Sequence, residues 1–199
     1  AQLRLLSEKI HAFTERQYSC LHRSILPAMR RKDIVFLTPR EMNETQLRHI
    51  NDYFNKTLFP VLTPLAVDRS RPFPLLANKS LNIAVRLQKD GESNFAVVQV
   101  PSILPRFLEL PCDNGRAFVL LENIIIEKLD QLFELHRIEA VCPFRVTRNS
   151  DLEIDEESED LMLAIEKSIK KRKRGRPVRL ELLQRCDAET KSFLVDMLE

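Results

Sequence analysis

The sequence predicts an α+β fold: a mixed, largely antiparallel sheet packed with helices, preceded by a long N-terminal helix that belongs to a helical bundle. Strand-like and helix-like segments alternate from about residue 33 onward. A Lys89-Asp90-Gly91 turn joins two alternating segments, which indicates an antiparallel hairpin. Apolar residues near the start recur about every 3.5 residues, which is typical of a helix that packs against other helices.

The composition is that of a globular chain with a core of its own. It has 199 residues, of which 44% are hydrophobic and 30% are charged, and its net charge is +2. The charge is too small to predict a polyanion partner by itself. No apolar run is long enough to span a bilayer, and the first residues lack the apolar core of a signal peptide. We therefore expect a cytoplasmic location.

The cysteines and histidines predict no metal or disulfide framework. Cys20, Cys112, Cys142 and Cys186 are far apart and form no C-x-x-C pair, so reduced and partly buried thiols are expected. The four histidines show no metal-ligand spacing. We assign no metal ligand in this chain.

The first element is a helix over residues 1–32. Its apolar stripe needs partner helices, so we expect the rest of a bundle outside this sequence. Pro27 should kink or restart the helix. The stripe consists of Leu3, Leu6, Ile10, Phe13, Leu21 and Ile25.

A short strand is expected at 34–37, followed by a helix from about 39 to 57. Thr38, Pro39 and Glu41 form a capping box at the start of this helix. Residues 58–80 contain four prolines among apolar residues, which predicts an ordered, extended loop.

The remaining elements follow from periodicity and turn signals. Leu81 to Gln88 alternates as a half-buried strand, and Phe95 to Pro101 returns beside it. Further strands are expected at 118–120, 141–147 and 177–183, and helices at about 121–134, 156–174 and 187–198.

The charge changes sign along the helix predicted at 156–174. Acids at its start and bases at its end complement the helix dipole, and Gly175 with Pro177 forms a standard stop. Helix stability does not fully explain the basic cluster near its end, which would attract a polyanion such as nucleic acid or a phosphate chain. The cluster is Lys170, Lys171, Arg172, Lys173, Arg174 and Arg176.

Two further features have alternative interpretations. Arg174-Gly175-Arg176 resembles an AT-hook, but it joins a capped helix to a strand rather than lying in disordered sequence, so no DNA partner is expected. Arg145 and Arg148 flank a strand end, where they contact phosphate, form an ordinary surface pair, or form a salt bridge to Asp151.

No catalytic pattern is present. The chain has only three glycines, Gly91, Gly115 and Gly175, and no phosphate-binding loop or nucleophile motif. We assign no catalytic or cofactor-binding residue.

Four blocks of sequence stand out: FPVLTPLAVDRSRPFP with NKSLNIAVRL, VQVPSILPRFLEL, FRVTRNSDLEIDEESEDL and RGRPVRLEL. Together they resemble polyphosphate kinase of the phosphohistidine type, and the resemblance extends over nearly the whole chain. Residues 1–34 resemble the end of the helical N-terminal domain, and residues 35–199 resemble the head, or middle, domain.

The resemblance implies that the full-length enzyme reversibly transfers the terminal phosphate of ATP to inorganic polyphosphate, with Mg²⁺. Its catalytic histidines, and its magnesium- and phosphate-binding arginines, are implied to lie in C-terminal domains outside these residues. The adenine-contacting asparagine is implied to lie in the earlier N-terminal domain. The fragment alone is expected to be inactive and to contain no ATP or Mg²⁺ site.

The head domain is implied to build a homodimer interface and to support the catalytic tunnel. We expect the loop at 58–80 and the hairpin after it to contribute to the interface. The basic cluster, with Arg145 and Arg148, is expected to lie near the polyphosphate path, since phosphoryl transfer depends on positioning and positive charge. Peripheral association with a membrane as part of a kinase complex stays open, as do two other functions: a nucleic-acid-binding module and a ligand-free dimerisation scaffold.

Overall fold

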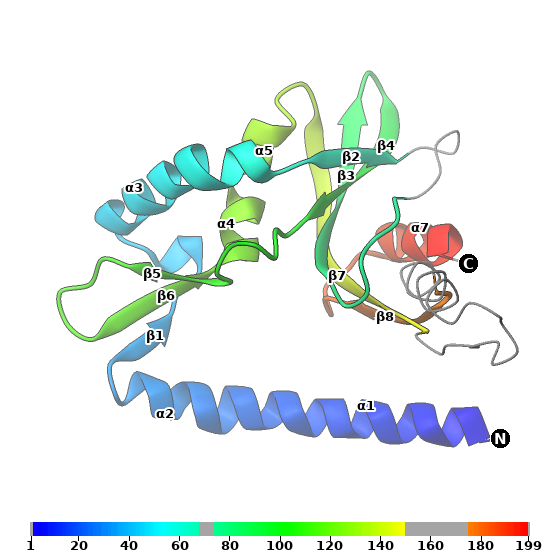
Figure 1. The fold of residues 1–199 in the computed structure, drawn as a ribbon, viewed down its shortest axis with the longest axis horizontal. Coiled ribbons are helices and arrows are strands. Elements are labelled where there is room, and N and C mark those ends of the chain that lie inside the picture. Colours follow the sequence, from blue (N-terminus) through cyan, green and yellow to red (C-terminus); the bar gives the residue numbers. More distant parts are fainter. Residues whose placement is uncertain (1, 68–73, 150–174, 199) are drawn as a thin grey trace, which may run out of the picture.

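The computed structural model describes residues 2–67, 74–149 and 175–198 and has the expected α+β architecture (Figure 1). A long helical segment lies along one side of two sheets. It consists of α1, Gln2–Cys20, a π-helical turn, Leu21–Ile25, and α2, Leu26–Arg30. Pro27 lies in the first turn of α2, so the helix restarts there after the π-helical turn, as a proline without an N–H requires.

The apolar stripe of α1 lies open in the described structure. None of the residues of α1, the π-helical turn or α2 is buried, and Leu3 and Phe13 are 83% and 69% exposed. A stripe of this kind on a monomeric surface is typical of an interaction site.

A small mixed sheet follows the helix. Its strands are β1, Ile34–Phe36, β5, Phe107–Leu110, and β6, Arg116–Leu120, in the order β1-β6-β5. β1 is parallel to β6, and β5 is antiparallel to it. The sequence did not predict β5, because it has only four residues between Pro105 and Pro111.

The helix predicted from residue 39 begins later, which is a correction. The Thr38 N–H donates to Glu41 Oε2 at 2.8 Å, but this box closes only a 3₁₀ turn, Pro39–Glu41. Met42 is extended, and Asn43 starts α3, Glu44–Tyr53, through a second box with Gln46. A π-helical turn, Phe54–Leu58, then prolongs α3. The competing cap at Asn43 therefore determined the boundary.

The larger sheet is antiparallel, in the order β2-β4-β3-β7-β8. A second correction concerns the expected loop at 58–80, since part of it forms β2 at the sheet edge, beginning at Pro64, where a proline is tolerated. Its strands are β2, Pro64–Val67; β3, Leu81–Lys89; β4, Glu92–Gln99; β7, Arg137–Arg148; and β8, Pro177–Leu182.

Four described helices, α3, α4, α5 and α7, cover this sheet. The helix expected at 121–134 is interrupted at Lys128 and forms α4, Leu121–Glu127, and α5, Leu129–Leu132. The last helix, α7, Ala188–Leu198, agrees with its prediction. Figure 1 shows α7 beside β7 and β8, away from α3, α4 and α5. The helix predicted at 156–174 lies outside the described residues.

The larger sheet has a hydrophobic core on each face. Ile83, Val85 and Leu87 of β3 pack into the core formed with α3, α4 and α5. Ala84 points to the opposite core, which includes Leu194 of α7. The strand expected to be half-buried is therefore covered on both sides, because β3 is the central strand and α7 covers its second face.

Candidate functional site

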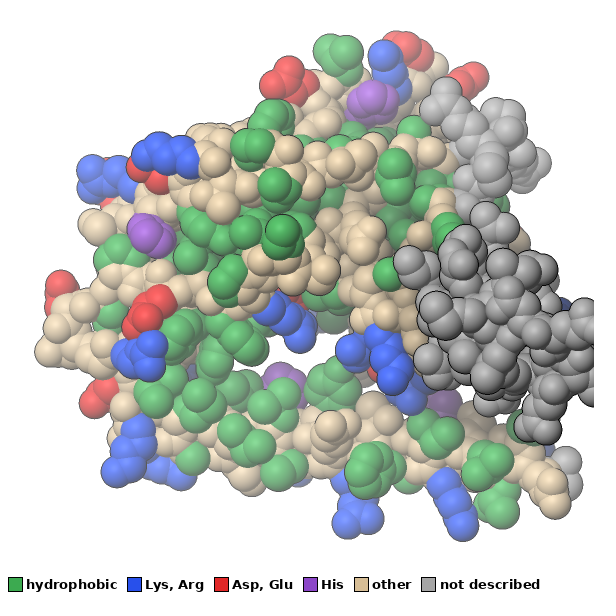
Figure 2. Space-filling view, viewed as in Figure 1, with side chains coloured by type: hydrophobic (Ala, Val, Ile, Leu, Met, Phe, Trp, Pro, Cys, Tyr) green, Lys and Arg blue, Asp and Glu red, His purple; other side chains and the backbone are tan. Residues whose placement is uncertain are grey.

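A groove in the described structure lies between α1 and the outer face of β7 and β8. It has a volume of about 750 Å³, and residues from Leu6 to Leu21 form its helical wall. Arg145, Arg179 and Glu181 form the opposite wall. Figure 2 shows this groove as a hollow between the long helix and the rest of the domain, with basic side chains beside it.

Strand alternation directs these charged side chains to the groove. Arg145 pairs in register with Glu181 across β7 and β8. The neighbouring residues Phe144, Val146, Leu180 and Leu182 point to the other face, where they pack in or against the core beneath α7. The alternation of two adjacent strands therefore separates one apolar face from one charged face.

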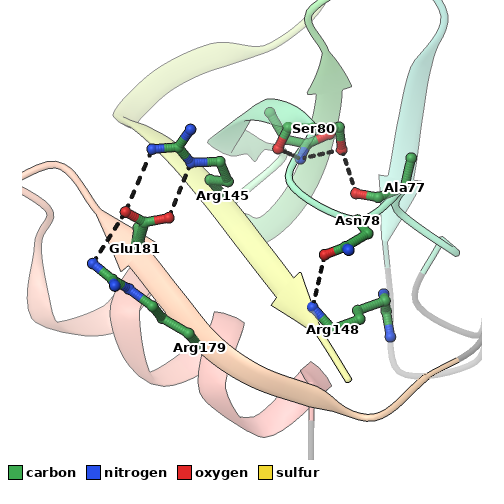
Figure 3. Close-up of polar contacts among 8 residues, drawn as sticks. Ala77, Asn78, Ser80, Arg145, Arg148, Arg179 and Glu181 are labelled. Atoms are coloured by element: carbon green, nitrogen blue, oxygen red, sulfur yellow. Dashed lines mark hydrogen bonds and ion pairs between the residues drawn. The ribbon is translucent and has the colours of Figure 1, made fainter. Parts of the chain in front are cut away.

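Glu181 holds the two arginines together (Figure 3). Arg145 Nε and Nη2 lie 3.0 and 3.4 Å from its carboxylate oxygens, and Arg179 Nη2 lies 3.2 Å from Oε1. The side chain of Arg145 is 45% exposed, so these pairs contribute little to stability. They fix two planar donor groups around one carboxylate, which leaves this cluster with a net positive charge.

Arg148 has a different environment from Arg145, although both were expected to contact polyphosphate. Its residue is 8% exposed. Its Nε donates to the carbonyl of Leu76 at 3.1 Å, and its Nη1 donates to the carbonyl of Gly175 at 3.0 Å. Its backbone N–H donates to Asn78 Oδ1 at 2.9 Å (Figure 3). Arg148 thus joins three segments of the chain through backbone carbonyls and an amide.

The turn before β3 is fixed against the same end of β7. Lys79 has a positive φ of 61°, and its N–H donates to the carbonyl of Val146 at 2.8 Å. Ser80 Oγ donates to the carbonyl of Ala77 at 2.8 Å (Figure 3). Asn82 Nδ2 donates to the carbonyl of Ser80 at 2.9 Å. These bonds hold residues 77–82 against the end of β7.

The structure describes only one residue of the basic cluster. Arg176 is exposed immediately before β8, and its carbonyl accepts a bond from the Asn149 N–H at 2.8 Å. Lys170, Lys171, Arg172, Lys173 and Arg174 lie outside the described residues. The structure therefore brings Arg145 together with Arg179 and Glu181, and it places Arg176 beside the strand end that Arg148 anchors.

Sequence reasoning missed Arg179 and Glu181 as groove residues. The alternation of Val178, Leu180 and Leu182 predicted the strand, and the residues between them had to point to the opposite face. The signal for their position was thus present. Their pairing with Arg145 depended on the register between β7 and β8, which are separated by a long segment.

A second ionic cluster holds the start of α7. Arg86 contacts Glu139, Asp187 and Glu189, with its Nη1 3.1 Å from Glu139 Oε2. Burial opposes ionisation of Asp187, but hydrogen bonds from Thr190 and the charge of Arg86 outweigh it and lower the pKa of this carboxyl. The Thr190 N–H donates to Asp187 Oδ1 at 3.0 Å, so Asp187 also caps α7.

The described residues contain neither a candidate metal site nor a candidate membrane-spanning helix. Residues 2–67, 74–149 and 175–198 contain no group of three or more His, Cys, Asp or Glu side chains arranged to hold a metal ion. Within the same ranges, no helix combines the length and apolar character needed to cross a bilayer.

Residues 45–199 match the family model described as the polyphosphate kinase middle domain. This chain belongs to the polyphosphate kinase family. The polyphosphate kinase of Halalkalibacterium halodurans is 44% identical over 204 aligned residues, which include the whole of this chain. The polyphosphate kinase of an Exiguobacterium species is 43% identical, also over the whole chain.

The fold agrees with that of a solved polyphosphate kinase. The crystal structure of the Porphyromonas gingivalis polyphosphate kinase matches 98% of this chain with a TM-score of 0.74 and 24% sequence identity. This chain spans only part of its relatives: 29% of the Halalkalibacterium halodurans polyphosphate kinase and 29% of the Porphyromonas gingivalis chain.

Proposed function

We propose that this chain is a non-catalytic region of a polyphosphate kinase, consisting of the end of the helical N-terminal domain, residues 1–34, and the head domain, residues 35–199. The full-length enzyme reversibly transfers the terminal phosphate of ATP to inorganic polyphosphate through a phosphohistidine, with Mg²⁺. The observation that carries the proposal is the family match over residues 45–199 in a chain that spans 29% of a relative.

The catalytic groups of this reaction then lie in parts of the enzyme outside this chain. Its role is to position and support them, in a cytoplasmic protein. The described residues offer ion pairs, caps and apolar cores, which are structural features. The groove wall of Arg145, Arg179 and Glu181 adds positive charge but no nucleophile.

The direct experiment compares ATP-dependent synthesis of polyphosphate by the 199-residue chain and by the full-length protein. We expect synthesis by the full-length protein only. Synthesis by the isolated chain would contradict the proposal. A folded isolated chain, checked by circular dichroism, is the necessary control, because an unfolded fragment would also be inactive.

The same proposal includes a homodimer formed through the head domain. Its support is the apolar exposure of the segment around β2, where Phe59, Val61, Leu65 and Leu75 are all exposed. Analytical ultracentrifugation of the full-length protein tests this. The double variant Phe59→Asp/Leu75→Asp should shift the enzyme toward the monomer, whereas Ile103→Asp, an exposed apolar position outside that segment, should leave it unchanged.

A contact with polyphosphate is the last part of the proposal. Arg145 supports it, because it lies on a groove wall with a second arginine and retains partial exposure. Lys170 to Arg174 stay a prediction from the sequence, and DNA is not the expected partner. A shift assay with duplex DNA across a salt series tests the DNA alternative, since a DNA-binding module would shift the duplex and this binding would weaken steeply with salt.

A further inference from the structure

Two cysteines meet in the core beneath α7. Cys142 lies on β7, is 0% exposed and belongs to the core that includes Leu194. Cys186 lies in the turn before α7, is partly exposed and packs against the same core. Both are free thiols.

Backbone hydrogen bonds hold the turn over Cys142. The Leu183 N–H donates to the carbonyl of Pro143, the residue after Cys142, at 3.1 Å. The Cys186 N–H then donates back to the carbonyl of Leu183 at 2.9 Å. The turn therefore brings Cys186 back to the strand beside Cys142, and Cys186 packs against the same core that contains Cys142.

The two thiols differ in their exposure to solvent. Burial, together with the interaction with Cys186, raises the pKa of Cys142 to about 12. Its Sγ also donates to the carbonyl of Pro143 at 3.6 Å, so the thiol keeps its proton. A peroxide in solution meets Cys186 first, because Cys186 is the partly exposed sulfur of the pair.

We propose that Cys186 and Cys142 form an oxidation site for peroxides, in which Cys186 is oxidised first and Cys142 resolves it to a disulfide. The Cys186 thiolate attacks one oxygen of hydrogen peroxide, the O–O bond breaks, and Cys186 sulfenic acid and hydroxide are formed. The Cys142 sulfur then attacks the sulfenic sulfur, the S–O bond breaks, and the departing hydroxide takes the Cys142 proton as water. The two thiols are oxidised by two electrons in total, and the peroxide is reduced to water and hydroxide.

The disulfide would join β7 covalently to the turn that begins α7. Asp187, the cap of α7, directly follows Cys186, and it also contacts Arg86 of β3. Oxidation would thus lock the start of α7 onto the sheet. In a reducing compartment such a bond is transient and reports oxidative conditions.

Peptide mapping of the full-length protein tests the proposal. Protein treated with hydrogen peroxide is alkylated, digested without reductant and analysed by mass spectrometry, with dimedone added in parallel to trap sulfenic acid. The expected product is a linked peptide containing Cys142 and Cys186, and it should disappear after reduction. In Cys142→Ala, dimedone should instead accumulate on Cys186.

The exposed residues Cys20 and Cys112 provide the control. Oxidation of Cys20 or Cys112 without a Cys142–Cys186 link in the wild-type protein would overturn the proposal. Equal dimedone labelling of Cys186 in the wild type and in Cys142→Ala would also overturn it. The wild-type map needs no substitution, so it decides the question even where Cys142→Ala fails to fold.

Discussion

Phe95 of β4 and Phe193 of α7 stack face to face, with ring centroids 3.8 Å apart and ring planes 5° apart. This contact joins the last described helix to the larger sheet from the side opposite α3 and α4. Together with Leu194 and the ion pairs of Arg86, it holds α7 in place.

Replacing Phe193 by Ala should lower the free energy of unfolding by about 2 kcal/mol, since the change removes an aromatic pair and part of an apolar contact. Val195→Ala, at an exposed position of the same helix, should cost less than about 0.5 kcal/mol. Urea denaturation of both variants checks this. Equal losses would show that the stack does not anchor α7.

Alanine substitutions at Arg148 and Arg145 should lower the free energy of unfolding by different amounts. Arg148→Ala leaves the carbonyls of Leu76 and Gly175 without their donor in a buried place, so we expect a loss of about 3 kcal/mol. Arg145→Ala removes an exposed ion pair and should cost less than about 1 kcal/mol. Thermal and urea unfolding measure both. A loss for Arg145→Ala as large as that for Arg148→Ala would refute the structural role of Arg148.

The space around Gly115 leaves no room for a side chain, whereas the space around Gly91 leaves room for one. Both have a positive φ, of 73° and 84°, but a Cβ added to Gly115 would meet the carbonyl oxygen of Asp33, while a Cβ at Gly91 meets open space. Gly115→Ala should therefore cost about 3 kcal/mol or more. Gly91→Ala should cost about 1 kcal/mol from strain alone. Similar unfolding midpoints for the two variants would contradict this account.

Acid should weaken the attachment of α7. Although burial opposes its ionisation, hydrogen bonds from Thr190 and the charge of Arg86 lower the folded-state pKa of Asp187 below its ordinary value of 3.8. The stabilisation is therefore fully present well above that value and is lost as the pH falls through the lowered folded-state pKa. Unfolding should become easier below about pH 4, and less steeply in Asp187→Asn than in the wild type. Parallel pH profiles for the two proteins would contradict the assignment.

Replacing Arg145 in the groove should affect the binding of polyphosphate more than the free energy of unfolding. In the full-length enzyme, Arg145→Gln should raise the KM for long-chain polyphosphate about tenfold, because a charge-assisted hydrogen bond contributes about 1.5 kcal/mol. Arg116→Gln is the matched control, since Arg116 is an exposed arginine paired with Glu109 away from the groove. Steady-state kinetics with short and long chains measure this. An unchanged chain-length dependence in Arg145→Gln would remove the proposed contact.

Much of the fold followed from local signals. The Asp90-Gly91 turn has the positive φ angles that its residues favour, and both strands of the hairpin were expected. The start of α3 was misplaced because two capping boxes follow each other, and the box at Asn43 is supported by a Gln46 bond to the Pro111 carbonyl. That bond spans 65 residues, so no local pattern predicts it.

Less of the candidate site than of the fold could be predicted from the sequence. The sequence predicts Arg145 as a candidate phosphate contact, and the alternation of β8 contains the signal for Arg179 and Glu181. The burial of Arg148 could not be foreseen, because its partners at Leu76 and Gly175 are 72 and 27 residues away. A basic side chain near a strand end has the same local pattern whether it faces solvent or backbone carbonyls.

The central proposal is that this chain is part of a polyphosphate kinase whose reactive groups lie outside residues 1–199. The most direct measurement is to phosphorylate the full-length protein with radiolabelled ATP, digest it and locate the phosphohistidine by mass spectrometry. We predict that the label lies on a histidine outside these residues. Label on His11, His22, His49 or His136 would contradict the claim.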